Sequence, residues 1–267
     1  MVPGRGVRSF PNVCDGHIVA SYRCRLMDAA LALIAAVVAG GFAIDLWRSQ
    51  LRRPRFHALA WATAMTLFAI ATSTLAWGLV RGWSDSSFRV FYYLGAIVNI
   101  PVLALGSVAL VRGERAARAA LAFLIPFLAL AAWSTMVAPA VGSVDQIGVP
   151  EGSAVFQRGM IDAPGTPPIP SPRTFAAIAG GLGTVIVVGL AAASMVRRRN
   201  NRDAVLGNGL IIGGTAAPAL GGSLTALGEG GAFAISLLVG AALLWAGYRV
   251  ASRSSHSTLI NADLDVT

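Results

Sequence analysis

The sequence contains no lysine, only three histidines and two cysteines, and few charged residues of any kind. Without lysine there is no side-chain amine for a Schiff base, which excludes a retinal-type chromophore site. The histidines His17, His57 and His256 lack the spacing of metal ligands, so the sequence predicts no zinc or haem site. Charged residues make up 12% of the 267 residues, about half the usual share, which is too little to cover a soluble domain of this size.

Catalytic signatures are missing as well. No phosphate-binding loop, GxSxG motif or dinucleotide fingerprint stands in a suitable context. Asp45 is the only carboxylate inside an apolar run, so paired-carboxylate chemistry has no second acid within the membrane. The sequence therefore predicts a protein that is not an enzyme and that needs no cofactor and no metal. A membrane enzyme with its residues in the outer loops stays as a third alternative.

Long apolar runs dominate what is present. Hydrophobic residues make up 55% of the chain, and seven runs are of spanning or near-spanning length. Because the sixth run contains Pro218 and many glycines, we expect it to be broken or tilted. The runs predict an all-α, polytopic bundle of seven transmembrane helices at about 29–46, 58–80, 90–111, 119–139, 174–196, 204–227 and 231–248.

Arginines between the runs predict the orientation of the chain. One set of connections carries 13 arginines, in clusters around Arg52, Arg115, Arg198 and Arg249, and the other set carries eight. The positive-inside rule places the amino terminus outside and the carboxyl terminus in the cytoplasm of a multi-pass cell-membrane protein. The expected partners are the lipid bilayer, anionic headgroups at the cytoplasmic clusters, and a second copy or another membrane protein. Nucleic-acid binding is not expected, although the net charge is +9.

The bundle domain covers residues 27–252, and the two ends of the chain and one long loop within this domain show no spanning pattern. Residues 1–26 have no helical or strand period, and we expect a non-native or disordered extension with translation starting at Met27. If this segment is native, it lies outside, where Cys14 and Cys24 could form a disulfide. Residues 140–172 predict a proline-rich, irregular external loop, and residues 253–267 a disordered cytoplasmic tail.

Polar residues form a stripe on the second run, which we call the hydroxyl stripe. At 100° per residue its members fall within an arc of about 100°, which predicts that this face points into the bundle. It either packs on other helices or lines a path for water or ligand. The stripe consists of Thr63, Thr66, Ser73, Thr74 and Trp77.

The third run combines an amide with a proline near the membrane centre. On a regular helix Tyr92, Gly95, Asn99 and Gly106 share one face. Pro101 has no N–H, so the carbonyl of the residue four positions earlier loses its helical partner. Asn99 is therefore either a ligand-binding node or an interhelical bond beside a proline kink. We expect it to bond to Thr66 or Ser73 or to the backbone of the sixth run.

Two further features each have a structural and a functional interpretation. Gly209 and Gly213, followed by Gly214 and Thr215, indicate close helix packing or, alternatively, a broken helix with free carbonyls. Asp45 lies near the inner end of the first run. This depth favours an ion pair with Arg48, Arg52 or another inner-loop arginine over a functional carboxylate.

The third run with its flanks, FRVFYYLGAIVNIPVLALGSVAL, resembles a segment of uncharacterised multi-pass integral membrane proteins of high-GC actinobacteria. The similarity extends over the chain from about Met27. It implies a polytopic membrane fold and carries over no substrate, cofactor or catalytic residue.

These observations predict a transporter-like or solute-binding membrane protein with a polar interior in the second, third and sixth runs. Its candidate residues are Asn99, Tyr92, Thr66, Ser73, Thr215 and Asp45. The alternative is a non-transporting sensor or assembly partner that acts by helix packing. A polar cavity that reaches one face of the bundle favours the first, and a closely packed bundle favours the second.

Overall fold

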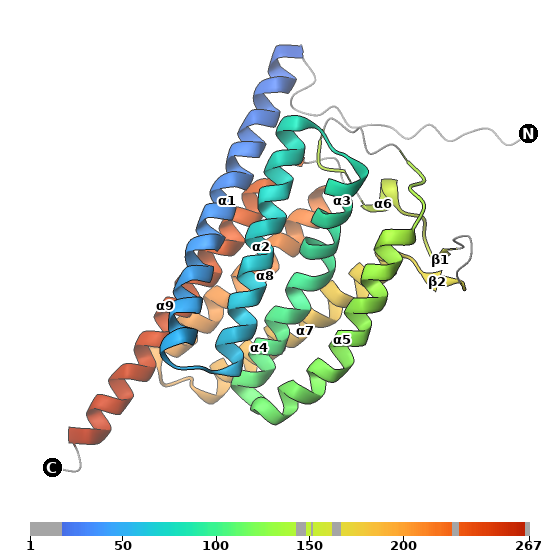
Figure 1. Cartoon of the computed structure of the whole chain (residues 1–267). Helices are drawn as coiled ribbons and strands as arrows, with labels where there is room; N and C mark the ends of the chain where they lie inside the picture. Colours follow the sequence, from blue (N-terminus) through green and yellow to red (C-terminus); the bar gives the residue numbers. More distant parts are fainter. Residues whose placement is uncertain (1–17, 143–147, 151, 162–166, 226–229, 265–267) are drawn as a thin grey trace, which may run out of the picture.

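The computed structural model describes residues 18–142, 148–150, 152–161, 167–225 and 230–264 (Figure 1). This part of the chain contains seven helical segments long and apolar enough to span a membrane, which confirms the prediction of an all-helical fold with seven helices of spanning length. The elements are α1 (Ile18–Arg52), α2 (Phe56–Arg81), α3 (Asp85–Tyr92), the π-helical η1 (Tyr93–Val98), α4 (Asn99–Arg112), α5 (Glu114–Val137), α6 (Gly152–Val155), β1 (Met160–Ile161), β2 (Ile169–Pro170), α7 (Pro172–Arg197), α8 (Arg202–Thr225) and α9 (Gly230–Leu264).

Local sequence signals explain where the spans begin and end. Gly82 and Gly113 follow α2 and α4 with φ of 86° and 91°, a conformation that side-chain-bearing residues rarely adopt. Gly113 alone connects α4 to α5, which forces these helices to lie antiparallel. Ser84 and Ser87 form a capping box at the start of α3. The segment Asp85–Arg112, made of α3, η1 and α4, is one continuous span.

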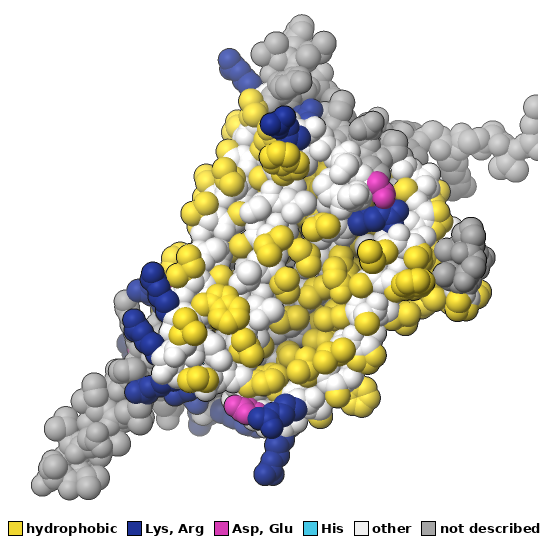
Figure 2. Space-filling view, in the orientation of Figure 1, with side chains coloured by type: hydrophobic (Ala, Val, Ile, Leu, Met, Phe, Trp, Pro, Cys, Tyr) yellow, Lys and Arg dark blue, Asp and Glu magenta, His cyan; other side chains and the backbone are white. Residues whose placement is uncertain are grey.

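The helices pack as neighbours across one bundle. α1 packs on α2 and α9, α4 lies between α2 and α7, and α8 pairs with α7 and α9. α5 lies at the edge opposite α1 and α9 (Figure 1). We call the end with the α1–α2, α4–α5 and α7–α8 connections the arginine face, and the opposite end, which carries α6, β1 and β2, the loop face. Arginines gather near both ends, with hydrophobic side chains between them (Figure 2).

Both ends of the bundle domain differ from the expected boundaries. α1 begins at Ile18, so residues 18–26 are helical where no period was recognised. One reason is that the Arg25 guanidinium donates to the Leu79 carbonyl at the end of α2, over 3.0 Å. Cys24 is disulfide-bonded. α9 continues to Leu264, so residues 253–264, expected to be disordered, are helical. Residues 1–17 lie outside the described part.

α8 is one continuous helix from Arg202 to Thr225, not the broken helix that Pro218 and the glycines suggested. Its glycines form a seam with α9 at intervals of seven residues, at positions 207, 214 and 221. A β-carbon on Gly214 would lie 2.8 Å from the Leu244 nitrogen and 2.9 Å from the Gly240 oxygen. The two backbones therefore approach too closely for any side chain at Gly214. Pro218 fits this seam because its ring packs over Gly240.

Candidate functional site

The backbone changes from α to π register just before Asn99. The Asn99 N–H donates to the Leu94 carbonyl, five residues earlier. Two residues later Pro101 provides no N–H. The α-helical hydrogen-bond pattern is therefore interrupted at Asn99 and again at Pro101. Single π turns inside α-helices often occur at functional sites. This turn lies near the middle of the helical segment Asp85–Arg112, which is long and apolar enough to span a membrane.

Three helices meet at this point. Gly95 faces Ala71 of α2, and Gly106 lies against the Trp61 ring of the same helix. Asn99 precedes Gly106 by seven residues, about two turns, so it lies on the side of α4 that faces α2. Gly183 of α7 packs against Ile100, the residue of α4 that follows Asn99. Asn99 is consequently only 3% exposed.

The side-chain oxygen of Asn99 accepts no hydrogen bond from any described residue. This atom, Oδ1, is buried. The predicted bond to the hydroxyl stripe is wrong: Thr66 donates to Ala62 O over 2.8 Å, and Ser73 donates to Ala69 O over 2.7 Å. Trp47 Nε1 donates to Thr66 Oγ1 over 3.1 Å. Helical hydroxyls can bond to the carbonyl four residues earlier, so they do not need an interhelical partner.

The hydroxyl stripe lies on the outside of the bundle, which corrects the prediction that it marks the interior. All of its members except Thr63 line an open groove of about 670 Å³ between α1 and α2, with Gly40, Ala43 and Ile44 on the α1 side. Ser73 is exposed, and Trp77 is 60% exposed. The self-bonded hydroxyls remove the cost of facing lipid, so their arc does not identify the buried face.

Asp45 forms the kind of ion pair that its depth predicts. Its Oδ2 atom lies 3.2 Å from Arg249 Nη1, and this arginine belongs to the inner-loop set, whereas Arg48 and Arg52 are not used. Trp245 Nε1 also donates to the same oxygen, over 3.0 Å. Both partners lie on α9, so Asp45 joins α1 to α9 near the arginine face.

The two remaining candidate residues lie in other parts of the bundle. Thr215 is 1% exposed in the α8–α9 seam, and its hydroxyl donates to Ile211 O over 2.8 Å. Tyr92 packs against Phe88 and Phe156 near the loop face, with ring centroids 5.7 and 5.2 Å away. Because η1 inserts an extra residue into the turn, Tyr92 does not share a face with Asn99. The six candidates do not form one site.

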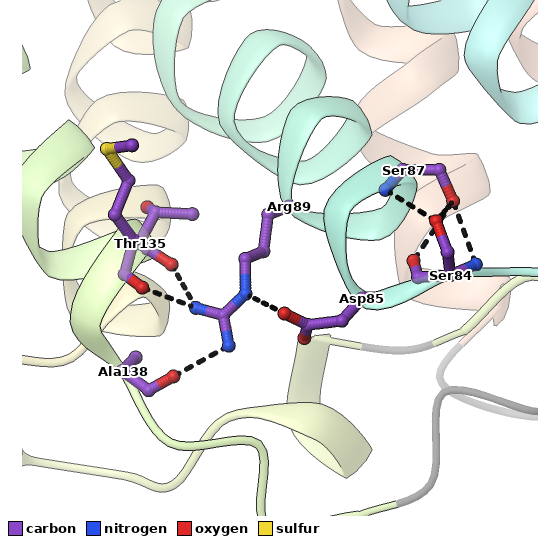
Figure 3. A network of polar contacts seen from close by, with 7 residues as sticks. Ser84, Asp85, Ser87, Arg89, Thr135 and Ala138 are labelled. Atoms are coloured by element: carbon purple, nitrogen blue, oxygen red, sulfur yellow. Dashed lines mark hydrogen bonds and ion pairs between the residues drawn. The ribbon is translucent and has the colours of Figure 1, made fainter.

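A polar network that the sequence analysis missed centres on Arg89 at the loop face (Figure 3). Its guanidinium pairs with Asp85 over 2.7 Å and donates to the carbonyls of Thr135, Met136 and Ala138 at the end of α5. It also lies over the Phe156 ring, 5.7 Å from its centroid. The Asp85–Arg89 spacing of four residues is the signal that could have indicated part of this network. It caps α5 and fixes the start of the following segment.

The described residues contain no group of three or more His, Cys, Asp or Glu side chains placed to hold a metal ion. A second hollow, of about 310 Å³, lies between α4, α5 and α7 and has apolar walls. No family matches the sequence, and neither curated proteins nor solved structures show significant similarity to the chain.

Proposed function

We propose that this chain is a non-transporting protein of the cell membrane that acts laterally, through its lipid-facing surface, as an assembly or interaction partner. One observation carries the proposal. Both hollows described above lie between helices on the outside of the bundle and are bordered by exposed side chains, such as Trp77 at one and Phe123 at the other. Binding at these places involves lipids or helices within the bilayer.

The polar groups inside the bundle support the same proposal. The buried hydroxyls of Thr72, Ser107, Thr135 and Thr215 each donate to a carbonyl four residues earlier on their own helix. Hydroxyls bonded in this way have used their donor hydrogen and offer a passing solute only acceptor lone pairs. A polar route through a membrane normally needs convergent polar or ionisable side chains. The proposal accordingly assigns no catalytic role to the interior.

The orientation belongs to the proposal too. With 13 arginines on one set of connections and eight on the other, the arginine face lies in the cytoplasm and the amino terminus outside. The arginine clusters then meet the leaflet with the more negative surface. Reporter fusions after Arg118 and Arg202 are expected to read as cytoplasmic, and a fusion near Gly152 as external.

Thiol labelling tests the absence of a water-filled path. In a background with both native cysteines replaced by serine, single cysteines at Thr72, Ser107 and Thr215 are small, nearly isosteric changes. We expect a membrane-impermeant maleimide to leave all three unlabelled from either side of the membrane. Arg115→Cys, exposed at the arginine face, is the matched positive control. Labelling of the interior positions at the rate of the control contradicts the proposal.

Solute handling is the second candidate, and one observation favours it. Asn99 Oδ1 is a buried acceptor without a described partner, beside a π turn near the membrane centre. A small donor molecule could occupy such a point. Solute-dependent protection of Asn99→Cys from a small, permeant thiol reagent would favour this candidate over lateral action.

A further inference from the structure

The hollow between α4, α5 and α7, which we call the α5 groove, is a separate feature of the lipid-facing surface. It is lined by α4 from Pro101 to Val108, by α5 from Ala120 to Phe127, and by α7 from Ile178 to Ile186. At its loop-face end Phe127 packs edge-on against Phe175, with ring centroids 5.4 Å apart. From this contact the groove extends toward the arginine face.

The depth of the α5 groove matches one leaflet. Pro101 is near the middle of the span Asp85–Arg112, and eleven residues separate it from Arg112 at the end of α4. At 1.5 Å per residue this distance is about 16 Å. Half of the hydrocarbon core of a bilayer is about 15 Å thick. The groove and the arginine below it therefore cover the leaflet on the arginine face, from its centre to its headgroups.

Two arginines lie below the α5 groove, one on each of two walls. Arg112 follows the lining residue Val108 by four residues, so it continues the same face of α4. Arg197 follows the lining residue Ile186 by eleven residues, about three turns, and continues the groove face of α7. Neither side chain makes an ion pair with any residue that the structure describes.

The two arginines also reach a similar depth. α4 and α7 run in the same direction, and Gly183 packs against Ile100. Arg112 lies twelve residues beyond Ile100, and Arg197 lies fourteen beyond Gly183. These separations correspond to about 18 and 21 Å along the two helices. Two positive charges without a described ion-pair partner thus border the headgroup end of an apolar groove.

We propose that the α5 groove binds an acyl chain of an anionic phospholipid from the leaflet on the arginine face, with the phosphate at Arg112 and Arg197. The inference rests on the lateral role proposed above and names its partner. The apolar walls account for the chain, and the two arginines account for the anionic headgroup. A volume of about 310 Å³ is at the lower end of small-molecule pockets, which suits one slender chain.

Native mass spectrometry of the full chain in detergent tests the headgroup contacts. Dioleoyl phosphatidylglycerol is titrated against dioleoyl phosphatidylcholine, which has the same chains and no net charge. We expect the Arg112→Gln/Arg197→Gln variant to bind phosphatidylglycerol roughly 30-fold more weakly. The control variant, Arg115→Gln/Arg198→Gln, removes the same charge from positions off the groove faces and should bind nearly as the wild type does. Equal losses in the two variants overturn the proposal.

A second pair of variants tests the acyl chain. Ala120→Phe fills the α5 groove and should weaken binding of both lipids, whereas Ala119→Phe is exposed on the same helix and should not. Unchanged binding to Ala120→Phe overturns the proposal, and so does displacement of phosphatidylglycerol by millimolar inorganic phosphate, which identifies a free-phosphate site. The thiol-labelling test of the lateral role does not depend on lipid binding. If the lipid tests fail while the interior thiols stay unlabelled, only the lipid proposal is overturned and the lateral role stands.

Discussion

Replacing Gly214 with alanine should force α8 and α9 apart. The new methyl group would lie 2.8 Å from the Leu244 nitrogen and 2.9 Å from the Gly240 oxygen, whereas ordinary contacts of this kind begin near 3.4 Å. Both atoms belong to the backbone of α9, so no side-chain rotation relieves the clash. Overpacking of this kind costs about 1–3 kcal/mol. Alanine offsets about 1 kcal/mol of this cost because it is the better helix former.

Gly209→Ala is the matched control, since a β-carbon there meets nothing within 4 Å. It makes the same chemical change in the same helix and retains only the favourable helix-propensity contribution. We therefore expect the free energy of unfolding of Gly214→Ala to be lower than that of Gly209→Ala by about 1–3 kcal/mol. Thermal unfolding in detergent, followed by circular dichroism, should show a midpoint lower by about 2–4 °C for each kcal/mol. Equal midpoints would refute the close backbone approach.

Three further substitutions have defined outcomes in the same unfolding assay. Asp45→Asn keeps an acceptor for the Trp245 indole and loses only a partly exposed ion pair, so it should cost less than about 1 kcal/mol; a larger loss contradicts the assignment. Arg89→Gln removes charged bonds to the end of α5 and should cost about 1.5–3 kcal/mol, with faster proteolysis between residues 138 and 171. Its control, Arg118→Gln, breaks an exposed pair and should cost under about 0.5 kcal/mol. Asn99→Leu should be neutral or stabilising because it removes an unpaired buried carbonyl, and marked destabilisation indicates an unrecognised partner.

Sequence patterns were sufficient for the spans and for the pairing of Asp45. Each apolar run falls in a helix long and apolar enough to cross a bilayer, and this property depends only on length and composition. The Asp45 ion pair follows from depth, because a carboxylate near a helix end can reach an arginine at the interface. Both predictions rest on the length, composition and depth of a segment. Neither requires knowledge of which helices are neighbours.

The orientation of each helix face could not be predicted in this way. Arcs of hydroxyls indicate a buried face only when the hydroxyls need partners elsewhere, and Thr66 and Ser73 bond to their own helix. The π turn before Asn99 displaces every earlier residue on that span relative to a regular helix. The Gly209–Gly213 pair matched a known motif, whereas the contact uses glycines seven residues apart, including Gly214. Neighbouring backbones, which a single sequence does not specify, decide these details.

Reactivity of a cysteine introduced in place of Asn99 tests the lateral role most directly. This position lies near the middle of the segment Asp85–Arg112, is 3% exposed and carries a buried acceptor without a described partner. In the serine background, Asn99→Cys should stay unmodified by a membrane-impermeant maleimide applied to either side, while Arg115→Cys reacts fully from one side. Modification of the Asn99→Cys variant from one side, at a rate near that of the Arg115→Cys control, would reveal an aqueous path to the centre of the bundle and contradict the account.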